Sequence, residues 1–116
     1  MTDAANQVRT LIAGALAGMV NLPGSYQKAS RLCGADWDPA CEGTAMTEGE
    51  DGLFTLVVEL PAGDYEYKVA LNGDWGVNYG SDGAQDGPNY TLSLSADSTV
   101  TFTYNPEDHL VEAVIE

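Results

Sequence analysis

The sequence has 116 residues, of which 44% are hydrophobic, and its 18 acidic side chains against four lysines and arginines give a formal net charge of −14. One domain of this length can bury a core without a metal or dense disulfides, and this apolar content excludes a disordered chain. The negative charge repels phosphates and anionic lipids, so we expect neither nucleic acid nor a membrane as a partner.

The first apolar stretch, LIAGALAGMV at 11–20, is about half as long as a membrane span needs to be. Its apolar side chains recur at helical spacing, which predicts a short leading helix. The remnant of a secretory signal is the alternative, although Asp3 occupies the region that should be positive and no clear cleavage site follows. We therefore separate residues 1–17, a leader or short helix, from one domain over residues 18–116.

After Val20, short runs of alternating apolar and polar residues are separated by turns, which indicates an all-β domain. LFTLVVEL at 53–60 and DYEYKVALN at 64–72 both alternate, and the PAGD turn between them predicts a hairpin. In the second strand, the side chains expected to point inward are Tyr65, Tyr67, Val69 and Leu71. Those expected to point outward are Glu66, Lys68 and Ala70.

Three further strands are predicted at 90–96, 98–104 and 110–116. Five or six strands of this kind predict an antiparallel two-sheet β-sandwich of immunoglobulin type. The intervening segment GVNYGSDGAQDGP at 76–88 contains almost nothing apolar to bury, so it is predicted to be loop throughout.

Cys33 and Cys41 bracket the segment CGADWDPAC. Two cysteines at this spacing in a loop can form a disulfide, which would hold Trp37 in place and indicate an oxidising, extracellular compartment; free thiols are the alternative. A zinc site needs more ligands than two thiols and the distant His109, and a catalytic thiol needs a histidine partner that the sequence does not place beside it. We expect the disulfide, no metal and no other cofactor.

Both tryptophans are candidates for a binding surface. Trp75 lies in the turn LNGDWGVNYG at 71–80, and a turn rich in Gly, Asn and Asp is a surface loop. A large ring there contributes little to a core, so a ligand is the better explanation. For Trp37 two roles stay open, since a lone tryptophan in a small β domain is often a core residue.

Lys68 is the only lysine or arginine after residue 31. An exposed ion pair, typically worth less than about 1 kcal/mol, is its ordinary role, and the alternative is a fixed donor to a ligand hydroxyl. Two rings with polar side chains and no convergent acid, base or metal describe a site that binds without reacting. Sugars suit such a site, because their C–H faces stack on indoles. From the adjoining loop we add Tyr79 and Asp86 as candidate ligands.

The segments CGADWDPACEGT, LPAGDYEYKVALNGDWGVNYG and DGPNYTLSL, in this order, closely resemble the small immunoglobulin-like modules that accompany pullulanases and related amylases. The likeness spans residues 19–109. More distantly, the chain is similar to family-20 and family-48 carbohydrate-binding modules, which hold α-glucans on two tryptophans and a lysine. The resemblance implies Trp37, Lys68 and Trp75 as these ligands and Asn89 as a further one.

The resemblance implies a non-catalytic accessory module that binds α-glucan, such as starch, glycogen, pullulan or maltooligosaccharides, beside the domains of a parent amylolytic enzyme. A structural spacer or protein-interaction module of the same fold is the second hypothesis, distinguished by whether the two tryptophans are exposed and adjacent. Catalysis ranks third, since paired carboxylates act only in a sugar-sized cleft. A calcium site at Asp82 and Asp86 ranks fourth, because the EF-hand spacing is missing.

Overall fold

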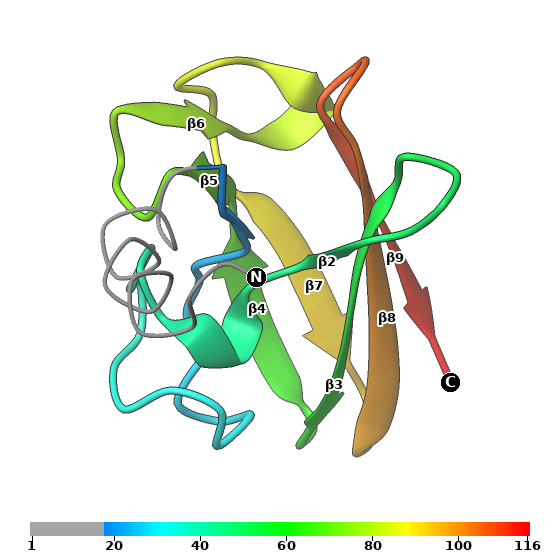
Figure 1. The fold of residues 1–116 in the computed structure, drawn as a ribbon. Helices are drawn as coiled ribbons and strands as arrows, with labels where there is room; N and C mark the ends of the chain where they lie inside the picture. The colour runs from blue at the N-terminus through cyan, green and yellow to red at the C-terminus, as the bar shows by residue number, and fades with distance from the viewer. Residues whose placement is uncertain (1–17) are drawn as a thin grey trace, which may run out of the picture.

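The computed structural model describes residues 18–116, and the predicted leader or helix at 1–17 lies outside the described residues (Figure 1). Between 18 and 116 the chain forms nine strands and two single-turn 3-10 helices, Glu42–Thr44 (η1) and Ser81–Gly83 (η2). All strand pairs are antiparallel, so the all-β prediction is confirmed. Neither 3-10 helix is long and apolar enough to cross a membrane.

The largest sheet has four strands in the order β2-β3-β8-β9. These strands are Thr47–Glu48 (β2), Phe54–Leu60 (β3), Ser98–Asn105 (β8) and Leu110–Ile115 (β9). β3 and β8 pair along the whole of β3, from Phe54 opposite Tyr104 to Leu60 opposite Ser98. β9 folds back on β8, so this sheet forms one side of the molecule in Figure 1.

Two smaller sheets form the other side of the molecule (Figure 1). One pairs Gly63–Tyr67 (β4) with Tyr90–Leu94 (β7), and the other contains Val20–Asn21 (β1), Val69–Leu71 (β5) and Val77–Tyr79 (β6) in the order β1-β5-β6. Only Lys68 separates β4 from β5, so the two small sheets follow one another along the chain.

Apolar side chains from all three sheets pack into one core. Phe102 of β8 lies at its centre, with its ring 4.9 Å from that of Tyr67 in an edge-on contact and 5.8 Å from that of Tyr26. This packing holds the inner face of β4 and β7 against the four-stranded sheet and leaves their outer face in solvent. The immunoglobulin type of the arrangement stays a prediction. The buried core residues are Val20, Leu22, Tyr26, Met46, Val58, Leu60, Tyr67, Val69, Leu92, Leu94, Val100, Phe102 and Tyr104.

The predicted hairpin between 53–60 and 64–72 is wrong. β3 pairs with β8, whereas β4 pairs with β7 in a different sheet. Alternation reports which side chains face a core, but it does not report which strand lies alongside. Here the apolar faces of β3 and β4 point at one another across the core, so the chain crosses between sheets at the PAGD turn instead of folding back beside itself.

The predicted strand 64–72 is interrupted at Lys68, and Ala70 is buried although its alternation predicted an outward position. The Lys68 N–H donates to the carbonyl of Pro23 at 3.0 Å, instead of to a strand partner. The second face of β5 is buried as well, because Ala70 lies between Asn21 and Asn78, which are themselves buried.

The prediction that 76–88 is loop throughout is also wrong. Val77–Tyr79 forms β6, an antiparallel partner of β5, so the turn that carries Trp75 is the tip of a β5–β6 hairpin. Asn72 and Gly73 supply the left-handed backbone of this tip, with φ of 64° and 74°. Three residues with one large aliphatic side chain are too few for a pattern to predict; only pairing with β5 makes them a strand.

Candidate functional site

The predicted disulfide is confirmed. Cys33 and Cys41 are joined, with a Cα–Cα distance of 6.1 Å, and these are the only two cysteines of the chain. The bond closes the loop 33–41, which has no strand or helix of its own and carries Trp37. Something other than regular secondary structure must therefore position this tryptophan.

The buried side chain of Gln27 holds one limb of this loop. Its Oε1 accepts from the Asp38 N–H at 2.8 Å, and its Nε2 donates to the Asp38 carbonyl at 2.9 Å. Nε2 also donates to the Thr44 hydroxyl, and Oε1 accepts from the Gly24 N–H. Gln27 thus clamps the peptide groups beside Trp37 as a neighbouring strand would.

The buried side chain of Asn21 holds the same limb further along the chain. Its Nδ2 donates to the carbonyls of Pro39 and Cys41 at 2.9 and 2.8 Å. Its Oδ1 accepts from the Leu22 N–H and the Thr44 hydroxyl, so its hydrogen-bonding capacity is filled. The two amides meet at Thr44 and form one buried network under the loop.

Trp37 itself has a φ of 58°, in the left-handed region that a bulky residue rarely adopts. Such strain persists only where the surroundings determine the backbone, and here the Trp37 N–H also donates to the Gly24 carbonyl at 3.1 Å. The side chain is half-buried and is not part of the core cluster. Trp37 is therefore a fixed ring at the surface of the domain and not a residue of the core cluster.

The structure brings the two tryptophans together. The ring centroids of Trp37 and Trp75 are 6.3 Å apart and their planes are inclined by 42°. Trp75 is 38% exposed at the tip of the β5–β6 hairpin, an unusual exposure for so large an apolar ring. The side chain of Asn78 donates to the Trp75 carbonyl at 3.1 Å, which ties the tip to β6.

The backbones of Lys68 and Trp37 are held by two neighbouring carbonyls. The carbonyl of Pro23 accepts from the Lys68 N–H and the following carbonyl, that of Gly24, accepts from the Trp37 N–H. The backbone at Gly24 is so close to β4 that a Cβ placed there would be 2.3 Å from the Glu66 carbonyl oxygen. Only glycine allows this approach of the two backbones. The approach brings the segment with Lys68 and the loop with Trp37 together at Pro23 and Gly24.

Asn89 contacts β4 from just before the start of β7. Its Nδ2 donates to Oε1 of Glu66 at 2.8 Å. Glu66 is exposed on the outward side of β4, as the alternation predicted, and Lys68, directly after β4, is half-buried. Asn89 is thus joined to β4 through Glu66, and Lys68 to the Trp37 loop through the backbone at Pro23 and Gly24.

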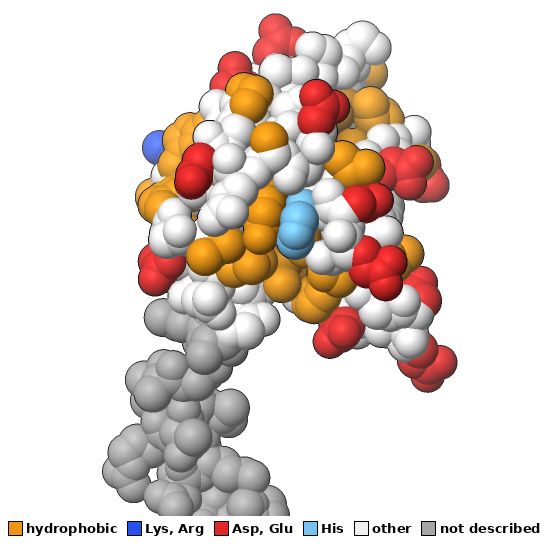
Figure 2. Space-filling model, turned by 90° about the horizontal axis from the view of Figure 1, so that it is seen from above, with side chains coloured by type: hydrophobic (Ala, Val, Ile, Leu, Met, Phe, Trp, Pro, Cys, Tyr) orange, Lys and Arg blue, Asp and Glu red, His pale blue; other side chains and the backbone are white. Residues whose placement is uncertain are grey.

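The two ligands added from the loop have other partners. The ring of Tyr79 stacks on His109 with centroids 3.7 Å apart and planes 3° apart, and the histidine lies among apolar side chains in Figure 2. Asp86 accepts at Oδ1 from Nδ2 of Asn78 at 3.0 Å. Asp86 is thus linked to the Trp75 hairpin through Asn78, whereas Tyr79 belongs to an aromatic stack of its own.

The sequence analysis missed a depression of about 400 Å³ that borders Trp37 on the outer face of β4 and β7. Alternation along β4, which places Asp64 and Glu66 on the same face as Lys68, was the available signal. The depression is lined by Ser25, Trp37, Asp64, Tyr65, Glu66, Thr91, Leu92 and Ser93.

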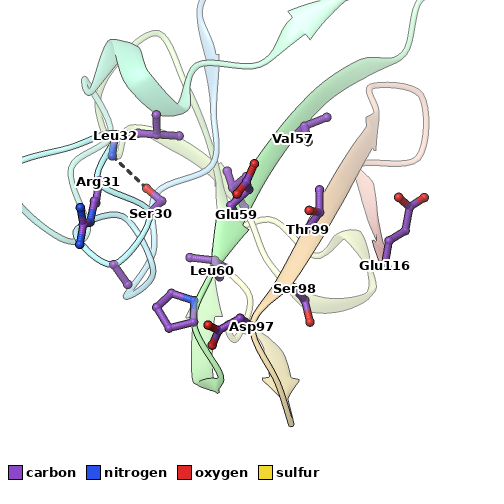
Figure 3. Close-up of a pocket in the computed structure, with 13 residues that line it drawn as sticks. Ser30, Arg31, Leu32, Val57, Glu59, Leu60, Asp97, Ser98, Thr99 and Glu116 are labelled. Carbon is purple, nitrogen blue, oxygen red and sulfur yellow. Dashed lines mark hydrogen bonds between the residues drawn. The ribbon is translucent and has the colours of Figure 1, made fainter.

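A larger cavity of about 690 Å³ lies elsewhere, over the four-stranded sheet (Figure 3). Figure 3 shows Arg31 and Leu32 on one side of it and Glu59, Thr99 and Glu116 along the sheet. None of its lining residues is aromatic and none is a predicted site residue. It offers no surface on which a sugar ring can stack, so its size does not make it the better candidate.

Metal chemistry finds no support in the described part of the chain. Among residues 18–116, no three His, Cys, Asp or Glu side chains lie close enough to hold an ion. Of the two carboxylates considered for calcium, Asp82 stands within η2 and Asp86 is engaged by Asn78. Fold and site together define a small all-β module whose distinctive surface is a pair of adjacent loop tryptophans.

Comparison with known proteins identifies the family. The family model described as the pullulanase X25 domain matches residues 19–111. The chain belongs to this family, an accessory module of pullulanases and amylopullulanases, and the resemblance seen in its sequence is confirmed.

The similar proteins are all much longer than this chain. An amylopullulanase of Thermoanaerobacterium saccharolyticum is 40% identical over 77 residues, which are 66% of this chain and 6% of that protein. One of Thermoanaerobacterium thermosulfurigenes is 36% identical over 77 residues, with shares of 66% and 4%. The solved pullulanase of Bacillus acidopullulyticus matches with a TM-score of 0.72 and 31% identity over 83% of this chain and 11% of its own.

Proposed function

We propose that this domain binds α-glucan without transforming it, on a site built from Trp37 and Trp75, with Lys68 and Asn89 as hydrogen-bonding partners. The observation that carries the proposal is the contact between two tryptophan rings from distant loops at the surface, 6.3 Å apart. A ring pair held this firmly, with one ring 38% exposed, has a better explanation in a ligand than in stability.

The inclination of the rings favours an α-linked chain. An α-1,4-linked glucan coils, so the C–H faces of successive sugars are tilted against one another, whereas a β-1,4-linked chain is a flat ribbon that suits coplanar rings. The planes of Trp37 and Trp75 differ by 42°. A neutral glucan is also indifferent to the charge of −14. In this proposal Lys68 and Asn89 supply donors to sugar hydroxyls.

The proposal also covers the parent protein, the location and the fold type of the domain. The names amylopullulanase and pullulanase of the similar proteins support a role beside the catalytic domains of an amylolytic enzyme, in the same chain. The disulfide supports an extracellular location, because cytosolic thiols are kept reduced. The immunoglobulin-type sandwich is the fold we propose for the arrangement of its sheets.

The test is calorimetric titration with maltoheptaose and β-cyclodextrin, with cellohexaose as the flat-chain control and tryptophan fluorescence as a second readout. Trp75→Ala should weaken binding by about 1–3 kcal/mol, roughly 5- to 150-fold in Kd, by analogy with other aromatic stacking. Its melting temperature should change little, since the ring contributes little to the core. Lys68→Ala should weaken binding by about 1.5–3 kcal/mol if its ammonium meets a hydroxyl.

Val114→Ala is the matched control, because it truncates an exposed apolar side chain on the opposite sheet. It should leave affinity unchanged. If the unaltered domain binds neither α-glucan, the alternative of a structural spacer or protein-interaction module replaces this proposal. Unfolding of Trp75→Ala would instead make the tryptophan pair a packing feature.

A further inference from the structure

We infer that the depression beside Trp37 on the outer face of β4 and β7 is a further sugar subsite, which takes a glucosyl unit next to those on the tryptophan pair. The inference rests on the proposed function and extends its site away from Trp75. Its volume of about 400 Å³ lies within the range of about 300–1,000 Å³ typical of small-molecule sites.

Trp37 connects the two parts of the site. Its ring contacts Trp75, and the same side chain forms one wall of the depression. A glucan that lies on both rings therefore has two directions in which to continue, and one of them leads into the depression. The strained, clamped backbone of Trp37 is explained if its ring must stay in place for sugars on both sides.

Two cross-strand pairs of side chains, here called rungs, line the depression. Asp64 lies opposite Ser93 and Glu66 lies opposite Thr91, all on the outward face of the sheet. Each rung places a carboxylate, which only accepts hydrogen bonds, beside a hydroxyl, which both donates and accepts. Neighbouring hydroxyls of a sugar have the complementary capacity, so an uncharged polyol satisfies both members of a rung.

Hydrogen bonds fix one rung in position. Glu66 accepts from Asn89 at Oε1, which leaves its second oxygen for a ligand. The hydroxyl of Ser25 accepts from the Glu66 N–H at 2.9 Å and anchors its backbone. Since Asn89 is itself a proposed ligand, Glu66 stands where the tryptophan site and the new subsite join.

The test compares a short and a long ligand in the domain and in a double variant, Thr91→Val with Ser93→Ala, which removes both hydroxyls at nearly constant volume. We expect maltoheptaose to bind about tenfold more weakly to the variant, the effect of losing about two neutral hydrogen bonds, while maltotriose changes less than about twofold. The control is Thr101→Val with Thr103→Val, which removes two hydroxyls from the other sheet. Melting temperatures show that both variants fold.

The outcomes separate the two claims. Failure of the unaltered domain to bind either sugar contradicts the proposed function itself. Equal maltoheptaose affinity in the unaltered domain and the double variant overturns the subsite, while the tryptophan site stands. An equal loss of affinity for both sugars also overturns the subsite, because the two hydroxyls would then not discriminate chain length. In NMR titrations, maltoheptaose but not maltotriose should shift the amide signals of Thr91 and Ser93.

Discussion

Two buried amide side chains, Gln27 and Asn21, give the Trp37 loop the hydrogen bonds that neighbouring strands provide elsewhere in this domain. Between them they fix the peptide groups of Asp38, Pro39 and Cys41, in the limb of the loop that follows Trp37. A buried polar group left without its partner costs about 1–3 kcal/mol, so this network leaves the loop few alternative conformations. The position of Trp37 therefore depends on residues that never reach the surface.

Gly24 is a residue at which the addition of a single methyl group should strongly destabilise the domain. Gly24→Ala would place a Cβ 2.3 Å from the Glu66 carbonyl oxygen, a backbone atom that cannot rotate away. We expect a loss of several kcal/mol of stability, because β4 must separate from the turn that anchors Lys68 and Trp37. Urea unfolding followed by circular dichroism measures it.

Gly34→Ala is the control for that substitution. Gly34 lies in the disulfide loop, and a Cβ there would meet nothing within 4 Å. Its stability should stay within about 0.5 kcal/mol of the unaltered domain. Equal stability of the two variants would mean that the close approach at Gly24 is not required.

At the scale of elements, the two tryptophans are positioned by different kinds of structure. Trp75 lies at the tip of a short hairpin whose strands, β5 and β6, pair over three residues. Trp37 lies in a loop without regular structure, closed by a disulfide and held by side chains. The hairpin is built from backbone hydrogen bonds and the loop is not, so the loop should be the more sensitive of the two to chemical change.

Reduction of Cys33–Cys41 should therefore affect both stability and binding. In the chain-entropy model, a ring of this size contributes about 2–3 kcal/mol to the free energy of unfolding. We expect the melting temperature to fall on reduction, and maltoheptaose affinity to fall with it as Trp37 loses its fixed orientation. Paired calorimetric scans and titrations with and without reductant measure both. Unchanged affinity after complete reduction would show that Gln27 and Asn21 suffice to hold the ring.

For the whole molecule, ionisation of the core tyrosines sets the upper limit of the pH range in which the domain stays folded. Burial raises the pKa of Tyr67 and of Tyr104 from 10.0 to about 12. Because these folded-state pKa values exceed the unfolded value, their contribution to stability is complete below pH 10 and is lost as pH rises from 10 to 12. Circular dichroism at increasing pH should show unfolding in this window. Each tyrosine contributes a slope of up to about 1.4 kcal/mol per pH unit.

Tyr104→Phe isolates one of these groups. The variant has no phenol to ionise at this position, so its loss of stability above pH 10 should be shallower, although it also lacks the contact of 2.9 Å between the Tyr104 hydroxyl and Nδ1 of His109. An identical slope in the variant and the unaltered domain would place the alkaline transition elsewhere.

The net charge of −14 predicts that salt affects the stability of the domain but hardly affects its binding of a neutral sugar. Self-repulsion among the carboxylates is screened as the Debye length falls from about 10 Å at 0.1 M to about 3 Å at 1 M, so the melting temperature should rise with sodium chloride. Maltoheptaose affinity should change less than about twofold, because the ligand is uncharged. A steep loss of affinity with salt would point to a charged ligand instead.

The sequence by itself determined what depends on near neighbours. The glycine-rich turn around Trp75, the disulfide across nine residues, and the alternation that buries Tyr67 and exposes Glu66 are all local properties, and each was predicted. Only the tertiary structure decided which strands pair, that Ala70 is buried, and that Val77–Tyr79 is a strand. It alone brought Trp37 to Trp75 and set Thr91 opposite Glu66. Such contacts join residues that are far apart in the chain, and they depend on how the strands and loops pack around the core, which no local pattern contains.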